Sequence, residues 1–429
     1  MSALRPSPAI TSIFRRPIVA SPAVRLALML WLAIGIAGTI RTLVHPNSHT
    51  VFPIFIAAGE RWWADQPLYE DYKPLDYFRY PPPAALLFGT FPWLGARAGG
   101  VVWLWVNIAF YASGIWRFRQ VVLPGWWTVH REVAYLVLAT VGALAGLWNG
   151  QCNAVIVGVL LWGAAELVSG RHRLSAIWFA VAVGIKLTPL PLALLICALW
   201  PKKFTGWFVV ALAAVGLVPF LSRPPAIVLH HYEDWSAQQK SLASERWPGF
   251  RDAWTVWQVL DSELSGGNHA IDLKAPLKSH AYRTLQLVTA IGCLAWCLAQ
   301  RRKLADPAQA VIRTLSMGAA WSMSFGPAVE FPSFVFLAPF LAIAAVDPEA
   351  RAMSRFLAIS AGALILSFGW GAVTLPLVPV FPAVLLALPF GTALFAASIA
   401  LPGPSARQLQ SQRSWHASRA AVPVTSSAA

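Results

Sequence analysis

The stretch of sequence that decides the fold is a long apolar run near the start of the chain. From Leu26 to Val44 it reads LALMLWLAIGIAGTIRTLV, with Arg41 as its one charged residue. About 20 apolar residues are needed for a helix to cross the hydrocarbon of a bilayer, so this run predicts a transmembrane helix. It is longer than the core of a signal peptide and lacks a small-x-small cleavage site, so we expect it to be retained.

The composition of the whole chain agrees with a protein that lipid covers. Of 429 residues, 57% are hydrophobic and 12% are charged, and the mean hydropathy is +0.58. A water-soluble domain needs far more charge on its surface. The net charge of +15 does not indicate nucleic-acid binding, because the Lys and Arg residues form short clusters between apolar runs, which is the pattern of membrane topology.

Cysteine usage gives no sign of a metal or a disulfide framework. All four cysteines lie inside apolar runs, where thiols behave as small hydrophobes, and no spacing typical of a zinc site is present. They are Cys152, Cys197, Cys293 and Cys297. We therefore expect no metal and no cofactor.

Further apolar runs predict an all-α polytopic membrane protein with about twelve transmembrane helices. They lie near residues 101–116, 132–148, 152–169, 175–187, 188–200, 204–221, 282–299, 308–326, 332–346, 354–375 and 381–400. Several are short for a span, and the pair within 175–200 can also be one broken hairpin.

The stretch 81–95 decides the topology. Three prolines open it, and Gly89 and Pro92 interrupt it. If it crossed the membrane, the later basic loops would all face outward, so the excess of Lys and Arg on cytoplasmic loops favours a re-entrant or interfacial segment. We expect a multi-pass protein of the cell membrane with residues 1–25 and a disordered tail, 401–429, in the cytoplasm, and a membrane core over 26–400.

This topology places four connecting segments on the outer face. They are a first outer loop (45–80), the Asn149 turn, a large outer loop (222–281) and the turn 326–333. We expect them to meet over one cavity at the membrane face, with the large loop packed on that face as a lid.

The first outer loop carries several acidic, basic and aromatic residues. Asp76, Arg79 and Tyr80 lie where the chain re-enters lipid, so they either face a cavity or anchor the interface. Glu60 is near Trp62 and Trp63, which favours an amphipathic interfacial helix. His49 lies in the same loop.

Polar residues within apolar sequence are the other candidates for a site. Asn149, Gln151 and Asn153 join two apolar runs without room for a loop, so their amides either cap a tight turn or line a wet pocket. Lys186 precedes Thr188 and Pro189 at a predicted helix break, where its ammonium either meets a phosphate or reaches to the surface.

Glu330 is a carboxylate in an otherwise uncharged turn bracketed by prolines. An acid near a helix start is favourable by itself, so a structural role and a functional one both stay open. No Gly-rich phosphate loop, HExxH or GxSxG motif appears, so any chemistry depends on scattered residues that the helices bring together.

An ordered series of short motifs over about residues 45–345 resembles glycosyltransferase family 87, a mannosyltransferase-like family of the GT-C superfamily. The motifs are Ala57-Ala58 with Trp62-Trp63 and Pro67-Leu68-Tyr69, then Phe78-Arg79-Tyr80-Pro81-Pro82, Asn149-Gly150-Gln151 with Asn153, Lys186-Leu187-Thr188-Pro189, and Gly326-Pro327 through Pro339.

The resemblance implies a membrane hexosyltransferase of the cell envelope. Such an enzyme takes a sugar, by family mannose, from a polyprenyl-phosphate donor and passes it to a lipid- or glycan-linked acceptor hydroxyl with inversion. It also implies an acidic general base in the first outer loop, with cations on the departing phosphate. Arg79, Tyr80, Asn149, Gln151, Asn153 and Lys186 are the expected substrate-binding residues.

The sequence departs from the family pattern at the expected base. An Asp-Phe pair is usual shortly before the Ala of the first outer helix, whereas this chain has His49-Thr50-Val51-Phe52. We rank Asp76 first as the catalytic base, followed by Glu330, His49 and Glu60. The alternatives are a lipid or solute transporter or flippase, although no internal repeat is evident, and an inactive GT-C-like scaffold.

Overall fold

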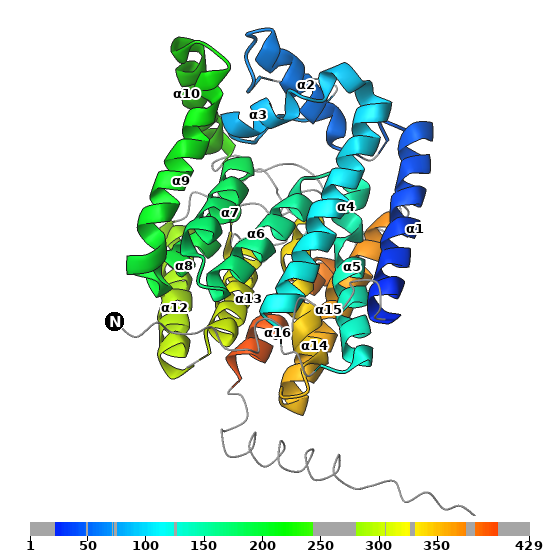
Figure 1. Cartoon of the computed structure of the whole chain (residues 1–429), viewed down its shortest axis with the longest axis vertical. Coiled ribbons are helices and arrows are strands. Elements are labelled where there is room, and N and C mark those ends of the chain that lie inside the picture. The colour runs from blue at the N-terminus through cyan, green and yellow to red at the C-terminus, as the bar shows by residue number, and fades with distance from the viewer. Residues whose placement is uncertain are drawn as a thin grey trace, which may run out of the picture.

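The computed structural model describes residues 22–48, 50–70, 72, 75–123, 127–242, 280–304, 306–326, 331–374 and 382–401. Its regular elements in this part of the chain are all helices, and most run side by side in one bundle with α2 (Phe52–Trp63) and α3 (Pro82–Phe88) across one end (Figure 1). We call the end that carries α2 and α3 the outer end, after the predicted topology.

Most of the helices coincide with predicted apolar runs, whereas those within the predicted outer loops and within 81–95 do not. Up to the large outer loop they are α1 (Pro22–Val44), α2 (Phe52–Trp63), α3 (Pro82–Phe88), η2 (Pro92–Leu94), α4 (Gly95–Val121), α5 (Val129–Asn149), α6 (Asn153–Val168), α7 (His172–Ile185), α8 (Leu190–Leu199), η3 (Pro201–Thr205), α9 (Gly206–Leu217), η4 (Val218–Leu221) and α10 (Pro225–Leu242). Later come α12 (His280–Lys303), α13 (Pro307–Phe325), η5 (Phe331–Phe336), α14 (Ala338–Val346), α15 (Ala352–Thr374) and α16 (Pro382–Ala400).

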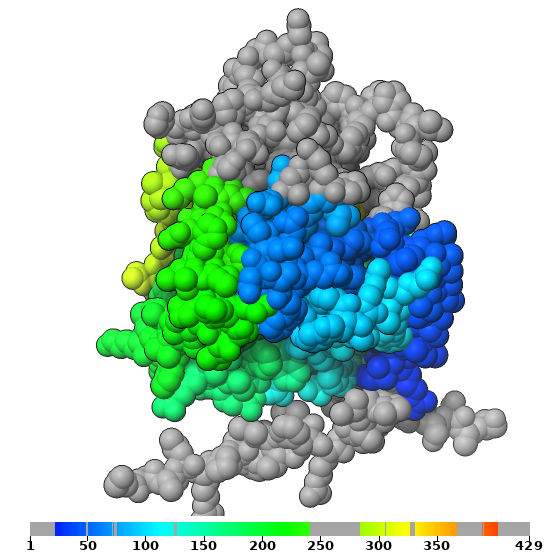
Figure 2. All heavy atoms as spheres, turned by 90° about the horizontal axis from the view of Figure 1, so that it is seen from above, coloured from blue at the N-terminus to red at the C-terminus, as the bar shows by residue number. Residues whose placement is uncertain are grey.

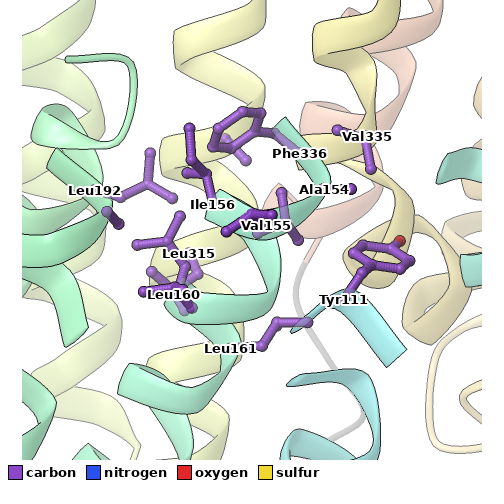
Figure 3. Packing of buried hydrophobic residues seen from close by; sticks show 14 of the residues in the cluster. Tyr111, Ala154, Val155, Ile156, Leu160, Leu161, Leu192, Leu315, Val335 and Phe336 are labelled. Carbon is purple, nitrogen blue, oxygen red and sulfur yellow. The ribbon is translucent and has the colours of Figure 1, made fainter. Parts of the chain in front are cut away.

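Helix α6 forms the centre of the bundle. Every one of its 16 residues except Trp162 and Val168 is buried, as expected for a helix that is apolar on all sides. Its side chains pack against α4, α7, α13 and η5, and Figure 3 shows Tyr111, Leu315 and Phe336 among its neighbours. The turn that precedes α6 is therefore held on several sides.

Two glycines let the backbones of α4 and α6 touch. A methyl group at Gly114 would lie 2.6 Å from Cα of Gly158, and one at Gly158 would overlap the carbonyl group of Phe110. Small residues permit such close helix packing in membranes. The contact fixes α4, and with it Trp103, against the start of α6.

Four stretches of the described chain are long and apolar enough to cross a membrane: Pro22–Val44, Pro82–Val121, Val129–Asn149 and Pro201–Leu221. Helices α6, α7 and α8 are apolar but shorter. The number of helices that cross, predicted as twelve, stays a prediction. Helix α3 has seven residues, about 10 Å of helix, and a turn at Gly89 separates it from η2.

The segments predicted to share the outer face touch one another. The Val51 amide donates to the Asn149 carbonyl oxygen at 2.9 Å. Arg223, just before α10, donates to the Trp62 carbonyl at 3.0 Å and forms an ion pair with Asp65 at 3.1 Å. Figure 2 shows α10 in green directly against the blue segment that includes α2. The first outer loop is thus joined to both the Asn149 turn and the start of α10 at the outer end.

Candidate functional site

The turn between α5 and α6 is built by Gly150. Its φ of 71° is in the left-handed region, which ends α5 and which glycine adopts at low cost. The indole N–H of Trp103 donates to the Gly150 carbonyl oxygen at 2.7 Å. Because the turn takes so few residues, Gln151 and Asn153 follow immediately and are buried.

The break between α7 and α8 presents Lys186 to this turn. Helix α7 ends at Ile185, Lys186 is extended (φ −154°, ψ 143°), and Pro189 caps α8. The residue before a proline is disfavoured in a helix, so Thr188-Pro189 keeps the break open. Lys186 Nζ donates to Asn153 Oδ1 at 3.1 Å.

Asn153 joins three elements through its side chain. Its Nδ2 donates to Gln151 Oε1 at 2.5 Å and to Ser333 Oγ at 3.3 Å, while its oxygen accepts from Lys186. We name Gln151, Asn153, Lys186 and Ser333 the Lys186 cluster. The cluster places one ammonium among neutral polar groups, an arrangement that suits an anion.

Tyr80 forms the aromatic wall of the cluster. Lys186 Nζ lies 5.7 Å from the centre of its ring, within the range of a cation–π contact. The Tyr69 hydroxyl donates to the Tyr80 carbonyl oxygen at 2.9 Å. Burial raises the pKa of Tyr69 well above its usual value, so this hydroxyl stays protonated and holds the loop in place.

Asp76 and Arg79 form an ion pair next to Tyr80. Arg79 Nη2 lies 3.2 Å from Asp76 Oδ1, and both side chains are about one quarter exposed. The Asp76 carboxylate also accepts from the Tyr77 amide at 2.8 Å. A carboxylate and a guanidinium are therefore held, still accessible, on the irregular segment that carries Tyr80.

The other predicted residues stand apart from the Lys186 cluster or outside the described part. Glu60 is exposed on α2. Asn149 faces the other side of the turn, toward a cavity described next. His49 and Glu330, the remaining candidate bases, lie outside the described residues. Within the described ranges, no group of three or more His, Cys, Asp or Glu side chains could hold a metal ion.

Sequence reasoning missed Ser333 and Asn107. Ser333 is 180 positions from Asn153, its hydrogen-bond partner, so no local pattern pairs them. Asn107 is a buried amide within the apolar run of α4. A lone amide inside such a run is the signal that could have found it.

A cavity of about 910 Å³ lies beside the turn, between the outer halves of α1, α4 and α5. Its walls are mostly apolar, and Ile34, Trp103 and Leu147 are among them. Asn107 and Asn149 contribute amides, and Arg41 lies at its edge. The outer end therefore holds a polar cluster and an apolar cavity, one on each side of the turn.

Comparisons with known proteins identify a family. The profile of glycosyltransferase family 87 matches residues 78–327, which include Tyr80, the Asn149–Asn153 turn and Lys186. The match begins after the Ala57 and Trp62 motifs. No curated protein matches the chain. Because the family match covers more than half of the chain, the protein belongs to glycosyltransferase family 87 and is a membrane glycosyltransferase.

Proposed function

We propose that the protein transfers a hexose, by family mannose, from a polyprenyl-phosphate donor to a hydroxyl of a lipid- or glycan-linked acceptor at the outer face of the cell membrane. The observation that carries the proposal is the Lys186 cluster, because it holds an ammonium at 3.1 Å from Asn153 at the outer end of an apolar bundle. A membrane lipid can bring a phosphate to this depth by lateral entry.

Lys186 takes the donor phosphate in this proposal. An ammonium has three N–H donors, and one of them points to Asn153, so a phosphate oxygen replaces water on another. The neutral amides of Gln151 and Asn153 keep the site free of competing negative charge. As the sugar leaves, the phosphate gains charge, and a fixed cation stabilises it most at that moment.

Asp76 is the proposed general base. The acceptor hydroxyl oxygen attacks the anomeric carbon, the bond from that carbon to the phosphate oxygen breaks, and the hydroxyl proton passes to the carboxylate. The configuration inverts because attack and departure occur on opposite faces. Arg79, 3.2 Å from Asp76, orients the carboxylate and adds positive charge near the phosphate, and the mechanism needs no metal.

The topology in the proposal is multi-pass with both termini in the cytoplasm. The basic residues Lys202 and Lys203 then face the cytoplasm, and the Lys186 cluster faces outward. On that side the proposed sugar donor is a polyprenyl phosphate and not a nucleotide sugar. Arg117 and Arg171, which both pair with the buried Glu166, belong to the same inner face. Cysteine labelling at Lys202 and at Thr90 tests the two sides.

The test is sugar transfer by the purified protein in lipid nanodiscs. Labelled polyprenyl-phosphate mannose and glucose are supplied with a membrane-lipid extract as acceptor, and products are separated. We expect a covalent product, a loss of about 100-fold or more in Lys186→Met and Asp76→Asn, and normal transfer in Lys202→Met, whose lysine is exposed in η3. No product from any donor, or full activity in Lys186→Met, would contradict the proposal.

A further inference from the structure

The cavity between α1, α4 and α5 has the size of a ligand site. Its volume of about 910 Å³ is near the upper end of the roughly 300–1,000 Å³ typical of small-molecule pockets. Apolar groups such as Ile34, Leu104 and Val141 form most of its wall, and Leu366 of α15 contributes as well. Such a wall favours a hydrocarbon chain.

Two asparagines that line this cavity, Asn107 and Asn149, each have a side-chain oxygen without a hydrogen bond from the described residues. Asn107 is 1% exposed, and its Nδ2 donates to the Trp103 carbonyl at 3.0 Å, which fixes the orientation of the amide. Its Oδ1, like Oδ1 of Asn149, is buried and accepts no hydrogen bond from the described residues. A buried acceptor left alone costs roughly 1–3 kcal/mol, so the cavity suits a ligand that carries hydroxyl groups.

Arg41, a cation that lines the cavity, already makes hydrogen bonds to backbone carbonyl groups. Arg41 donates to the carbonyl oxygens of Trp148 and Ser48, both at 2.5 Å, and its guanidinium lies 4.3 Å from the centre of the Trp148 ring. These contacts tie α1 to the end of α5. Among the described residues that line the cavity, Asn107 and Asn149 have the buried oxygens that lack a donor, and a phosphate ester without hydroxyls cannot supply one.

One wall, formed by residues 149–153 and 331–333, separates the cavity from the Lys186 cluster. Asn149 and Gly150 line the cavity, whereas Gln151 and Asn153 belong to the cluster. The start of η5 repeats this division, since Phe331 and Pro332 line the cavity and Ser333 binds Asn153. A ligand in the cavity thus ends beside the site proposed for the donor phosphate without occupying it.

We propose that this cavity binds the apolar chain of a lipid acceptor, with the hydroxylated head of that lipid at Asn149. The inference rests on the proposed function and deepens it, because it makes the acceptor a hydroxyl-bearing lipid. The donor chain is the poorer occupant, since its phosphate belongs on the Lys186 side of the wall.

Photo-crosslinking tests the assignment. Three probes carry a diazirine in the apolar chain: a monoacyl glucoside, a phosphocholine lipid with the same chain, and a polyprenyl phosphate. Each is irradiated with the protein in nanodiscs, and labelled peptides are identified by mass spectrometry. We expect the glucoside to label the part of α5 around Val141 and Leu144, which line the cavity, in preference to the other two probes.

Variants of residues that line the cavity test whether the glucoside is labelled from within it. Asn107→Leu removes the free acceptor and Ala37→Phe fills space in the cavity. Ala33→Phe is the matched control, because Ala33 is exposed one turn earlier on α1 and does not line the cavity. Loss of one hydrogen bond is worth about tenfold in binding, so Asn107→Leu should lower glucoside labelling about tenfold and raise the KM for the acceptor. Ala37→Phe should have the same two effects because its ring occupies space that the lipid chain needs, while Ala33→Phe matches wild type.

The results separate this inference from the proposed function. Equal labelling by the phosphocholine lipid, preferred labelling by the polyprenyl phosphate, or normal labelling in Ala37→Phe overturns the inference while transfer from the donor stands. Absence of transfer in the wild type, with glucoside labelling that still depends on Asn107, overturns the proposed function and retains the lipid site. Lys186→Met should stop transfer and leave glucoside labelling intact.

Discussion

Lys186 and Asn153 join the break after α7 to the first turn of α6 by a hydrogen bond of 3.1 Å. Asn153 is fully buried, and its amide also donates to Gln151 and Ser333. The ammonium is therefore held by an amide that is itself fixed on three elements. Such fixed groups stabilise developing charge without having to reorganise.

The first prediction concerns this amide. Asn153→Leu removes the partner that orients Lys186, so the KM for the donor should rise roughly tenfold, in line with the loss of one hydrogen bond to a charged group. Asn153→Asp should impair the enzyme more, because a carboxylate pairs with Lys186 and repels a phosphate. Donor titrations in nanodiscs measure both. Asn47→Asp, in the described loop away from the cluster, is the control, and a donor KM unchanged in both Asn153 variants would refute the role.

The second prediction concerns the contact of α4 with α6. Gly158→Ala places a methyl group on the Phe110 carbonyl, and overpacking of this kind costs about 1–3 kcal/mol. The melting temperature in detergent should fall by several degrees. Gly292→Ala, which meets nothing within 4 Å, should leave it unchanged or raise it. Equal melting temperatures for Gly158→Ala and wild type would show that the helices are not in contact there.

The same contacts show how far sequence reasoning reaches. Apolar period and length predicted α1 and α5 to within a few residues, because burial in lipid imposes one composition on a whole helix. The start of α4 at Gly95 was missed, since Gly95, Arg97 and Gly99 do not read as an apolar run.

The candidate site was predicted in part for a related reason. Lys186 and Asn153 are polar residues in apolar sequence, so each could be singled out, and the structure brings both together with Gln151 and Tyr80. Their pairing with Ser333 depends on helix packing and has no local signal. Asp76 and Arg79 pair with each other, and their roles stay predictions.

The third prediction is a pH dependence at α10. His231 is 2% exposed and its ring centre lies 5.5 Å from that of Trp62. Burial lowers the pKa of His231, against the opposing effect of Asp234 and Asp65. The folded state therefore favours the neutral ring, and stability is lost as the pH falls below the unfolded pKa of about 6.5 toward the lower folded value.

Hydrogen exchange of the α10 amides between pH 7.5 and 5 measures this effect. Protection should fall at the acidic end in wild type, and His231→Phe should abolish that loss because it keeps the ring contact and cannot be protonated. His230→Gln is the control, since His230 is largely exposed and pairs with Asp234. An identical acid response in His231→Phe and wild type would assign the effect to other groups.

The fourth prediction concerns the link between α2 and α10. Arg223 donates to the carbonyl oxygens of Trp62 and Trp63 and pairs with Asp65. Its side chain is only 18% exposed, so its removal leaves carbonyl groups unpaired. Arg223→Met should increase proteolysis of the first outer loop several-fold, whereas Lys240→Met, an exposed residue of α10, should not. Equal cleavage rates would mean that Arg223 does not hold the loop.

The most direct measurement is an electron cryomicroscopy structure of the protein in nanodiscs with a non-hydrolysable polyprenyl-phosphate sugar analogue. We predict the phosphate within hydrogen-bond distance of Lys186 Nζ, about 2.7–3.2 Å, with the sugar directed toward Asp76, and no bound analogue in Lys186→Met. A phosphate bound elsewhere, with Lys186 and Asn153 still in contact and no ligand between the turn and Tyr80, would contradict this prediction.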